Sequence, residues 1–232
     1  MSFRVKIITP IQVDEADLQR RKRRYGERAA PDTHIEVVGL SDGPTALETP
    51  GDMLFSEHAV FQEGAKTTAD EVDAILIDCI FDPAVEALQK HLDIPVFGPL
   101  RTSLALVLMV SPNFAIVGRG SQHGEMFADI VARYGYRDRL AAIRTLDLTY
   151  AKGRQAAHFD VAMRQRLKQV VEEDHARAVV LGSTTMALTD EVAAVAGDVP
   201  LFLTGMVTLG IMESLWRDGL LRTAMGRTAA SG

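Results

Sequence analysis

The stretch Asp73-Ala-Ile-Leu-Ile-Asp-Cys79 has a counterpart later in the chain, Arg177-Ala-Val-Val-Leu-Gly-Ser183. Each stretch is a short apolar run that ends in a side chain with a nucleophilic atom, and each is followed by a segment of helix length. That segment then reaches a matching start, Asp93-Ile-Pro-Val-Phe97 or Asp198-Val-Pro-Leu-Phe202. The offset is 104 residues from Cys79 to Ser183 and 105 residues from Asp93 to Asp198. A nearly constant offset favours an internal repeat over two α/β units that merely look alike.

Short apolar runs rich in valine and isoleucine alternate with helical patterns along the chain. The runs mostly lack polar alternation, which is typical of strands covered on both faces, as in a parallel sheet. Helical spacing is clearest at Phe159, Met163 and Leu167, within the segment 159–173. The predicted strands are residues 5–8, 35–40, 74–77, 95–97, 114–117, 140–143, 178–181 and 200–203.

The alternation of strands and helices, together with the repeat, predicts an α/β fold of two pseudo-symmetric halves. Each half is expected to hold a mainly parallel sheet flanked by helices. We assign residues 1–98 to the first half and 99–205 to the second, with 206–232 packing back on the first. Ligands of open parallel sheets bind beyond the carboxyl ends of the strands, so the active site is expected in the cleft between the halves.

The composition excludes several classes of protein. The chain has 232 residues and a net charge of −6, which gives no electrostatic footprint for nucleic acid. The basic run 20–24 follows acidic residues, an order that complements a helix dipole, and we interpret it as a solvated helix. A single cysteine, Cys79, excludes an internal disulfide. The N-terminus is unlike a signal peptide, and no apolar stretch reaches about 18 residues, so a cytoplasmic protein with no membrane partner is expected.

Cys79 ends the third predicted strand and begins the turn Cys79-Ile80-Phe81-Asp82-Pro83. Asp82 fits a helix cap, and Pro83 fits the first turn of the helix that would follow. A thiol at a helix N-terminus is favoured as the thiolate, and the backbone N–H groups there can bind an anion. The alternative is that Cys79 is a small buried apolar residue, which is the usual place of a free cysteine.

Ser183 stands at the equivalent place in the second half, within Gly182-Ser183-Thr184-Thr185. This stretch also follows a strand and precedes a helical pattern. Its hydroxyl and backbone N–H groups could bind a carboxylate, although plain turn and capping chemistry would account for the same residues. If the halves face each other, Cys79 and Ser183 face each other across the cleft.

Several segments share their pattern with a known family. Residues 72–83, which include Cys79, and the stretch Ile94-Pro-Val-Phe-Gly98 resemble the first-cysteine region of the hydantoin racemases, in the aspartate/glutamate/hydantoin racemase superfamily. The stretch Val180-Leu-Gly-Ser-Thr-Thr-Met186 resembles their second-cysteine region, with serine in place of that cysteine. Weaker similarities lie at Pro44-Thr-Ala-Leu-Glu48, Tyr134-Gly135 and Arg139.

The resemblance implies a cofactor-independent enzyme in which one thiolate removes a proton from a substrate carbon and a second thiol delivers one to the opposite face. Carried over to this chain, Cys79 is the base, acid or nucleophile, and Ser183 takes the place of the second cysteine. Ile80, Thr184 and Thr185 would offer backbone or hydroxyl contacts to the anion, in an oxyanion-hole role. Serine is far too weak an acid to act as a thiolate-like base near neutral pH, so one-sided chemistry is expected.

Three further residues are candidates for substrate binding. Arg101 stands where hydantoin racemases carry an acidic residue, and it could bind a second carboxylate or simply be a surface charge. Thr9 follows the first strand, and Ser121 lies in the stretch 118–124; both could contact the substrate or serve only in turns. The six histidines show no metal-ligand spacing, so no metal site is predicted.

The leading interpretation is an isomerase, either a racemase or an epimerase, that acts on a small molecule at the carbon next to a carboxylate or imide. The alternatives are a one-cysteine lyase such as an arylmalonate-type decarboxylase, and a maleate-type cis-trans isomerase. A non-catalytic small-molecule binder is the third class, because two-lobed α/β clefts also serve that purpose. The chain could also associate as a homo-oligomer.

Overall fold

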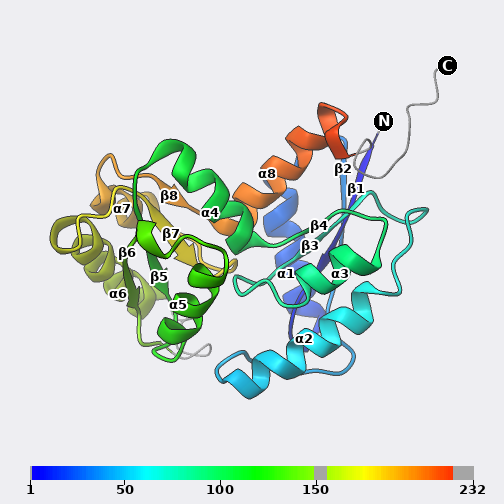
Figure 1. The fold of residues 1–232 in the computed structure, drawn as a ribbon, viewed down its shortest axis with the longest axis horizontal. Helices are drawn as coiled ribbons and strands as arrows, with labels where there is room; N and C mark the ends of the chain where they lie inside the picture. Colours follow the sequence, from blue (N-terminus) through cyan, green and yellow to red (C-terminus); the bar gives the residue numbers. More distant parts are fainter. Residues whose placement is uncertain (1, 149–155, 222–232) are drawn as a thin grey trace. The chain divides into compact units, whose positions relative to one another are not determined.

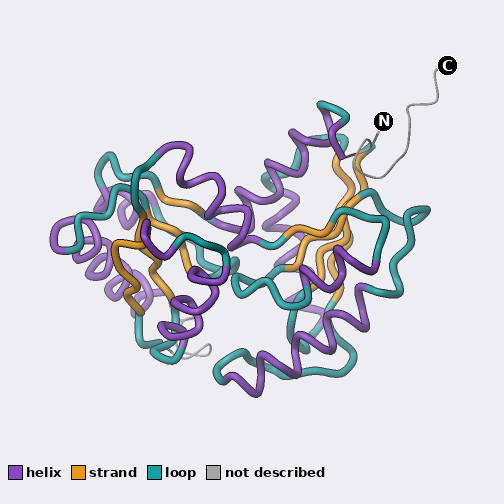
Figure 2. Tube along the Cα trace, in the orientation of Figure 1, coloured by secondary structure: helices purple, strands orange, loops and turns teal. Residues whose placement is uncertain are grey.

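The computed structural model describes residues 2–148 and 156–221, in which strands and helices alternate (Figures 1 and 2). These residues fall into two compact units. The first unit comprises residues 1–47, 51–99 and 205–232, and the second comprises 48–50 and 100–204, in each case so far as they are described. Each unit is built around its own parallel sheet.

The sheet of the first unit has the strand order β2-β1-β3-β4, and all its strand pairs are parallel. The two central strands pair from Val5 opposite Ala74 to Ile8 opposite Ile77, so they end at the same level. The residues after each central strand therefore lie at one edge of the sheet. The strands are β1 (Phe3–Ile8), β2 (Thr33–Val38), β3 (Ala74–Ile77) and β4 (Val96–Phe97).

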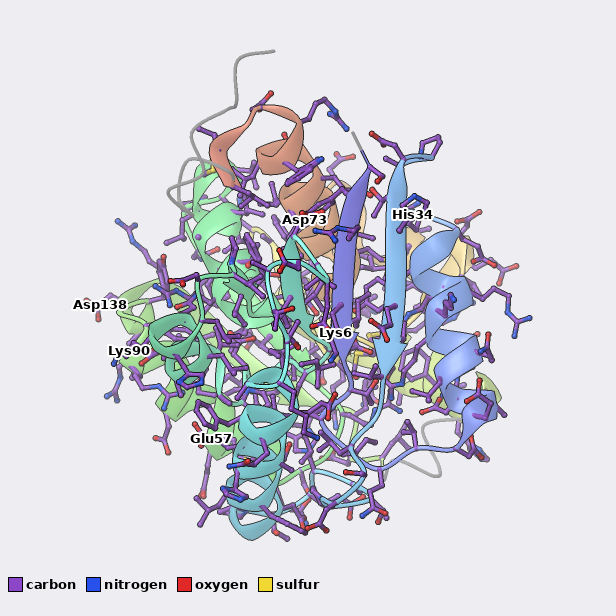
Figure 3. All side chains as sticks on the ribbon, turned by 90° about the vertical axis from the view of Figure 1, so that its right-hand side faces the viewer. Lys6, His34, Glu57, Asp73, Lys90 and Asp138 are labelled. Atoms are coloured by element: carbon purple, nitrogen blue, oxygen red, sulfur yellow. The ribbon has the colours of Figure 1, made fainter. Side chains whose placement is uncertain are left out.

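Helices cover both faces of this first sheet (Figure 1). α1 (Glu15–Gly26) and α8 (Thr204–Arg217) lie on one face, and α2 (Pro50–Gly64) and α3 (Val85–His91) lie on the other. Lys6 of β1, labelled in Figure 3, points toward α2, where its Nζ lies 3.2 Å from a carboxylate oxygen of Glu63. The core against α1 and α8 consists of Phe3, Val5, Ile7, Tyr25, Ala74, Leu76, Leu209, Met212 and Leu221.

The second unit repeats this arrangement with the strand order β6-β5-β7-β8. Its strands are β5 (Phe114–Gly118), β6 (Leu140–Thr145), β7 (Val179–Gly182) and β8 (Leu201–Phe202). α4 (Pro99–Val110) and α5 (His123–Arg133) cover one face, and α6 (Ala156–Lys168) and α7 (Asp190–Ala193) cover the other. α6 continues as a π-helical turn over Gln169–Glu173, and the core on its side includes Ala115, Val117, Phe159, Met163, Leu167, Val170, Val179 and Leu181.

The two strand orders are identical when each strand of the first sheet is matched to the strand four places later in the chain. The prediction of an α/β fold with two pseudo-symmetric halves is therefore confirmed. Every predicted strand overlaps an observed one, and the predicted helix 159–173 corresponds to α6 with its π-helical turn. The apolar runs locate the strands well because both faces of each sheet are covered, which leaves a continuous apolar signal.

Gly118 and Gly182 stand opposite each other at the carboxyl ends of β5 and β7. A Cβ atom added to Gly182 would lie 2.8 Å from the Cα of Gly118 and 2.9 Å from the carbonyl oxygen of Val117. Both of these atoms belong to the backbone, so no change of rotamer could make room. The missing side chains let the two strand ends approach closely, and the next residues, Arg119 and Ser183, start from neighbouring positions.

Gly182→Ala is expected to lower the free energy of unfolding by about 1–3 kcal/mol, the usual cost of overpacking an interior. The matched control is Gly210→Ala in α8, where an added Cβ meets nothing within 4 Å. That substitution is expected to raise the free energy of unfolding by about 0.5–1 kcal/mol, because alanine forms helices better than glycine. Urea denaturation followed by circular dichroism measures both, and equal effects would contradict the close approach of the strands.

Candidate functional site

Cys79 lies in a tight turn at the carboxyl end of β3. Its backbone N–H donates to the carbonyl of Ile77 at 2.7 Å, which closes a γ-turn, and its own carbonyl accepts from the N–H of Asp82 at 3.2 Å. Cys79 is 5% exposed and Ile80 is 4% exposed. The thiol is therefore desolvated at the edge where ligands of parallel sheets bind.

The helix after Cys79 begins later than the sequence predicts. Asp82 and Ala84 have positive φ angles of 51° and 58°, and α3 starts at Val85 with Ala84 as a cap that makes no side-chain bond. The prediction that Asp82 caps the helix and that Pro83 lies in its first turn is therefore wrong. The effect of a helix dipole falls off within one turn, so α3 does not stabilise a thiolate at Cys79.

Burial raises the pKa of the Cys79 thiol far above its ordinary value. The backbone N–H of Phe81 lowers this pKa, the carboxylates of Asp82 and Asp78 raise it, and the guanidinium of Arg21 lowers it by a smaller amount. The net effect keeps the thiol protonated at neutral pH, so the predicted thiolate is wrong for the protein without substrate. In this form Cys79 can give a proton but cannot take one.

The carboxylate of Asp78, directly before Cys79, is buried among charged and polar partners from α1. Arg21 donates to it through Nη1 at 2.5 Å, and Tyr25 donates through its hydroxyl at 2.6 Å. Arg24 lies 3.7 Å from the same carboxylate, and Nε of Arg21 also pairs with Asp17 at 3.1 Å. These five residues are called the Asp78 cluster below.

The Asp78 cluster corrects the interpretation of the basic run 20–24 as a solvated helix face. Arg21 is 3% exposed, so part of this run forms buried ion pairs. Burial, and secondly the charge of Asp78, raise the pKa of Tyr25 well above its ordinary value, so Tyr25 remains a neutral hydrogen-bond donor. The backbone N–H of Asp78 donates to the carbonyl of Ile8 at 2.8 Å, so β1 holds the main chain just before Cys79 while α1 holds the Asp78 side chain.

Thr9 lies beside Asp78 at the same edge, because β1 and β3 stay in register up to Ile8 and Ile77. Its backbone N–H donates to the carbonyl of Val38 at 2.8 Å. Its Oγ1 atom is buried and has no hydrogen-bond partner among the described residues. A buried polar group in this state carries a penalty of about 1–3 kcal/mol, which a suitable ligand atom would remove.

Ser183 occupies the place in the second unit that Cys79 occupies in the first. Ile75 pairs with Val96, and Val179 pairs with Leu201, so Cys79 and Ser183 each stand four residues beyond matched strand positions. This register supports the internal repeat at the level of the sheets. The side chains at the two equivalent places nevertheless have different surroundings.

The second unit brings three polar side chains together at the ends of β5 and β7. The hydroxyls of Ser183 and Thr185 lie 3.0 Å apart, and the N–H of Thr185 donates to Ser183 Oγ at 3.3 Å. Arg119 donates to Thr185 Oγ1 through Nη2 at 3.3 Å and is 7% exposed. Arg119, Ser183 and Thr185 are called the Arg119 cluster below.

Arg119 is a site residue that the sequence pattern does not predict, although the pattern does place the stretch 118–124 in a turn between a strand and a helix, as the structure has it. The pairing of Gly118 with Gly182 is what sets Arg119 beside Ser183. A usable signal was the repeat itself, because it predicts that the fifth and seventh strands are neighbours, as the first and third are.

The remaining candidates lie in different settings. Thr184 is buried next to Ser183, whereas Arg101, in the first turn of α4, and Ser121, in the turn after β5, are exposed. The structure thus gathers Thr9, Cys79 and Ile80 at the edge of the first sheet. It gathers Ser183, Thr184 and Thr185, with Arg119, at the edge of the second.

The described residues offer neither a metal-binding cluster nor a membrane-spanning helix. Within residues 2–148 and 156–221, no group of three or more His, Cys, Asp or Glu side chains is arranged to hold a metal ion. None of the helices in these ranges has both the length and the apolar character needed to cross a membrane. That the chain works without a cofactor stays a prediction.

Comparison with known sequences finds one family. A sequence model described as Asp/Glu/Hydantoin racemase matches residues 18–209. The hydantoin racemase of Pseudomonas sp. (strain NS671) is 33% identical over 160 residues, which are 68% of this chain and 64% of that racemase. The aligned segment thus spans slightly less than two thirds of the relative.

Solved structures share the fold of this chain. The allantoin racemase from Klebsiella pneumoniae has a TM-score of 0.82 and 22% identity, with 100% of this chain and 96% of that chain covered. A liganded double mutant of arylmalonate decarboxylase has a TM-score of 0.67 and 15% identity, with the same coverage of both chains, 100% and 96%. At these identities the likeness concerns the fold alone.

Cys79 is the chain's one cysteine, so its alkylation by iodoacetamide reports the state of a single thiol. We expect slow alkylation at neutral pH and a rate that still rises at pH 9.0, because burial raises the pKa of the Cys79 thiol above its ordinary value. Protein unfolded in urea is the control, and its rate should level off at pH values above the ordinary thiol pKa of about 8.5. A plateau at neutral pH in the folded protein would contradict the raised pKa.

Asp78→Ala is expected to lower the free energy of unfolding by about 3–5 kcal/mol, because removing one partner leaves the charge of Arg21 buried with less compensation. The control is Glu57→Ala on the exposed surface of α2 (Figure 3), where a change within about 0.5 kcal/mol is expected. Urea denaturation in one buffer measures both variants. If Asp78→Ala lowers the free energy of unfolding no more than Glu57→Ala does, the Asp78 cluster does not stabilise the carboxyl edge of the first sheet.

Proposed function

The chain belongs to the Asp/Glu/hydantoin racemase family, and from this premise we propose that it is a cofactor-independent enzyme that moves a proton at a carbon next to a carboxylate or imide. The leading form of the proposal is a racemase or epimerase of a small molecule, in line with the hydantoin racemase relative. The observation that carries it is the placement of the chain's one thiol in a buried turn at the carboxyl edge of a parallel sheet.

We propose Cys79 as the residue that transfers the proton. In the racemase form, the thiol releases its proton to solvent as the substrate binds, and the N–H of Phe81 and the charge of Arg21 favour the thiolate that remains. This thiolate takes the α-proton, and the electron pair of the broken C–H bond stays on the substrate as a carbanion or enolate. Return of that proton from Cys79 gives exchange with retention, whereas a proton from solvent on the opposite face gives the other isomer and leaves the thiol protonated.

Ser183 and its neighbours are proposed to bind the anionic part of the substrate. A serine hydroxyl is not acidic enough to supply a base near neutral pH, but it can donate a hydrogen bond. The hydroxyls of Thr184 and Thr185 and the backbone N–H of Ile80 are proposed to do the same. Donors held in place stabilise the negative charge that develops on the substrate in the transition state.

Three further substrate contacts are proposed with different support. Thr9 has the most direct support, because its buried Oγ1 would gain a hydrogen bond from a substrate atom. Arg101 and Ser121 are exposed, so in this proposal they contact only the outer part of a bound substrate.

One observation favours a second candidate, a one-cysteine decarboxylase. A protonated thiol, with a hydroxyl in place of a second thiol, suits a reaction that needs a proton donor and no base. In decarboxylation the C–C bond breaks, CO2 leaves, and the electron pair stays on the α-carbon, which then takes the proton of Cys79. Solvent returns a proton to the thiolate, so atoms and charges balance.

Incubation with hydantoins, amino acids, malonates and maleate in deuterated water separates these candidates. A racemase incorporates deuterium at the α-carbon and changes the isomer ratio, a decarboxylase releases CO2 and adds one deuterium, and a cis-trans isomerase changes the double-bond geometry. Cys79→Ala is expected to reduce turnover by about 10²–10⁴-fold, the usual share of a general acid or base. Its circular dichroism and thermal unfolding should stay close to those of the wild type.

The same exchange experiment with Ser183→Cys examines whether the chemistry is one-sided. The wild type should exchange the α-proton of one enantiomer much faster than that of the other, and a second thiol should reduce this bias. Ser2→Cys, on the exposed start of the first unit, is the control and should leave the bias unchanged. Equal exchange from both enantiomers by the wild type would mean that another residue is the second base. Full activity in Cys79→Ala would remove Cys79 from the mechanism.

A further inference from the structure

We infer that the Arg119 cluster binds a free carboxylate of the substrate, so that this chain acts on an open-chain acid rather than on a closed imide ring. The inference rests on the proposed function and narrows it, because that function treats carboxylates and imides alike. It makes Arg119 a specificity-determining residue, alongside the hydroxyls of Ser183 and Thr185.

The backbone brings the cluster together at the carboxyl edge of the second sheet. Gly118 and Gly182 pair at the ends of β5 and β7, and the lack of a side chain at both positions lets the strands approach closely. Arg119 and Ser183 are the next residue on each strand. The cluster therefore belongs wholly to the second unit and lies at the edge where parallel sheets bind their ligands.

The donors of the Arg119 cluster match the oxygens of a carboxylate. The guanidinium is a planar fork of N–H donors suited to two parallel hydrogen bonds with a carboxylate. Nη2 of Arg119 lies 3.3 Å from Thr185 Oγ1, which lies 3.0 Å from Ser183 Oγ, so the fork adjoins two rotatable hydroxyl donors. A closed imide ring presents carbonyl and N–H groups without the full negative charge that a guanidinium attracts.

Burial strengthens this preference. Arg119 is 7% exposed, and Ser183 and Thr185 beside it are half-buried. The attraction between opposite charges is several times stronger in such a desolvated place than in water, and a neutral ring gains none of it. An arginine that only stabilised the turn would change the affinity for an acid and for a ring by the same factor, whereas a carboxylate-binding arginine changes mainly the affinity for the acid.

Two ligands that differ mainly in the carboxylate provide the test: N-carbamoylphenylalanine, an open acid, and 5-benzylhydantoin, its closed ring, both as racemates. Isothermal titration calorimetry gives the Kd of each ligand for the wild type, Arg119→Gln and Arg119→Lys. The control variant is Arg137→Gln, because Arg137 is an exposed arginine of the same unit. The wild type should bind the acid more tightly. Arg119→Gln should weaken acid binding by about 10- to 100-fold, the range of a charged hydrogen bond, and ring binding by less than about 3-fold. Arg119→Lys should keep part of the preference, and Arg137→Gln all of it.

Equal wild-type affinity for both ligands, an equal loss for both in Arg119→Gln, or no binding of the acid at millimolar concentration would each overturn the inference. Thermal unfolding checks that each variant folds, and if Arg119→Gln does not, the wild-type comparison and Arg119→Lys decide. Deuterium exchange at the α-carbon tests the proposed proton transfer independently of carboxylate binding. If the acid binds but neither ligand exchanges its α-proton, the carboxylate site stands and the proposed proton transfer is wrong. If only the ring exchanges, and Arg119→Gln does not change that rate, proton transfer stands and the carboxylate site is wrong.

Discussion

The buried carboxylate of Asp78 is the charge on which the carboxyl edge of the first sheet depends. A carboxylate out of water is stable only where ion pairs and hydrogen bonds replace its hydration. Arg21 and Tyr25 provide that replacement from α1, and the ion pair with Arg21 spans 57 residues of sequence. It joins α1 to the end of β3 one residue before Cys79. Moving the Cys79 turn would uncover the charge, so the position of the turn follows from the ion pair.

The two units share a backbone plan and differ in the chemistry of their edges. Their strand orders match, and Cys79 and Ser183 stand at equivalent distances from matched strand positions. The first edge holds a protonated sulfur close to two carboxylates, whereas the second holds hydroxyls and the guanidinium of Arg119. Under the proposed function, one edge supplies a proton and the other supplies positive charge, and the serine at position 183 is part of that division.

The sequence predicts the sheets well and the surroundings of the thiol poorly. Strands covered on both faces leave continuous apolar runs, so their positions can be identified locally. The positive φ angle of Asp82 is not visible in that way, since aspartate before proline also fits a helix cap. Arg21 resembles a surface charge because Asp78, the partner that buries it, lies far along the chain, and Arg119 acquires its setting only when β5 and β7 pair. Such features depend on tertiary contacts that local pattern cannot contain.

A lone, buried and protonated sulfur also has a consequence for oxidative damage. Peroxides react with the thiolate form of cysteine, and the sulfenic acid that results is commonly trapped by a neighbouring thiol as a disulfide. Cys79 is buried with a raised pKa, and it is the one cysteine of the chain. The thiol is therefore expected to react slowly with peroxide, and a sulfenic acid formed there would find no second thiol in the same chain with which to close a disulfide.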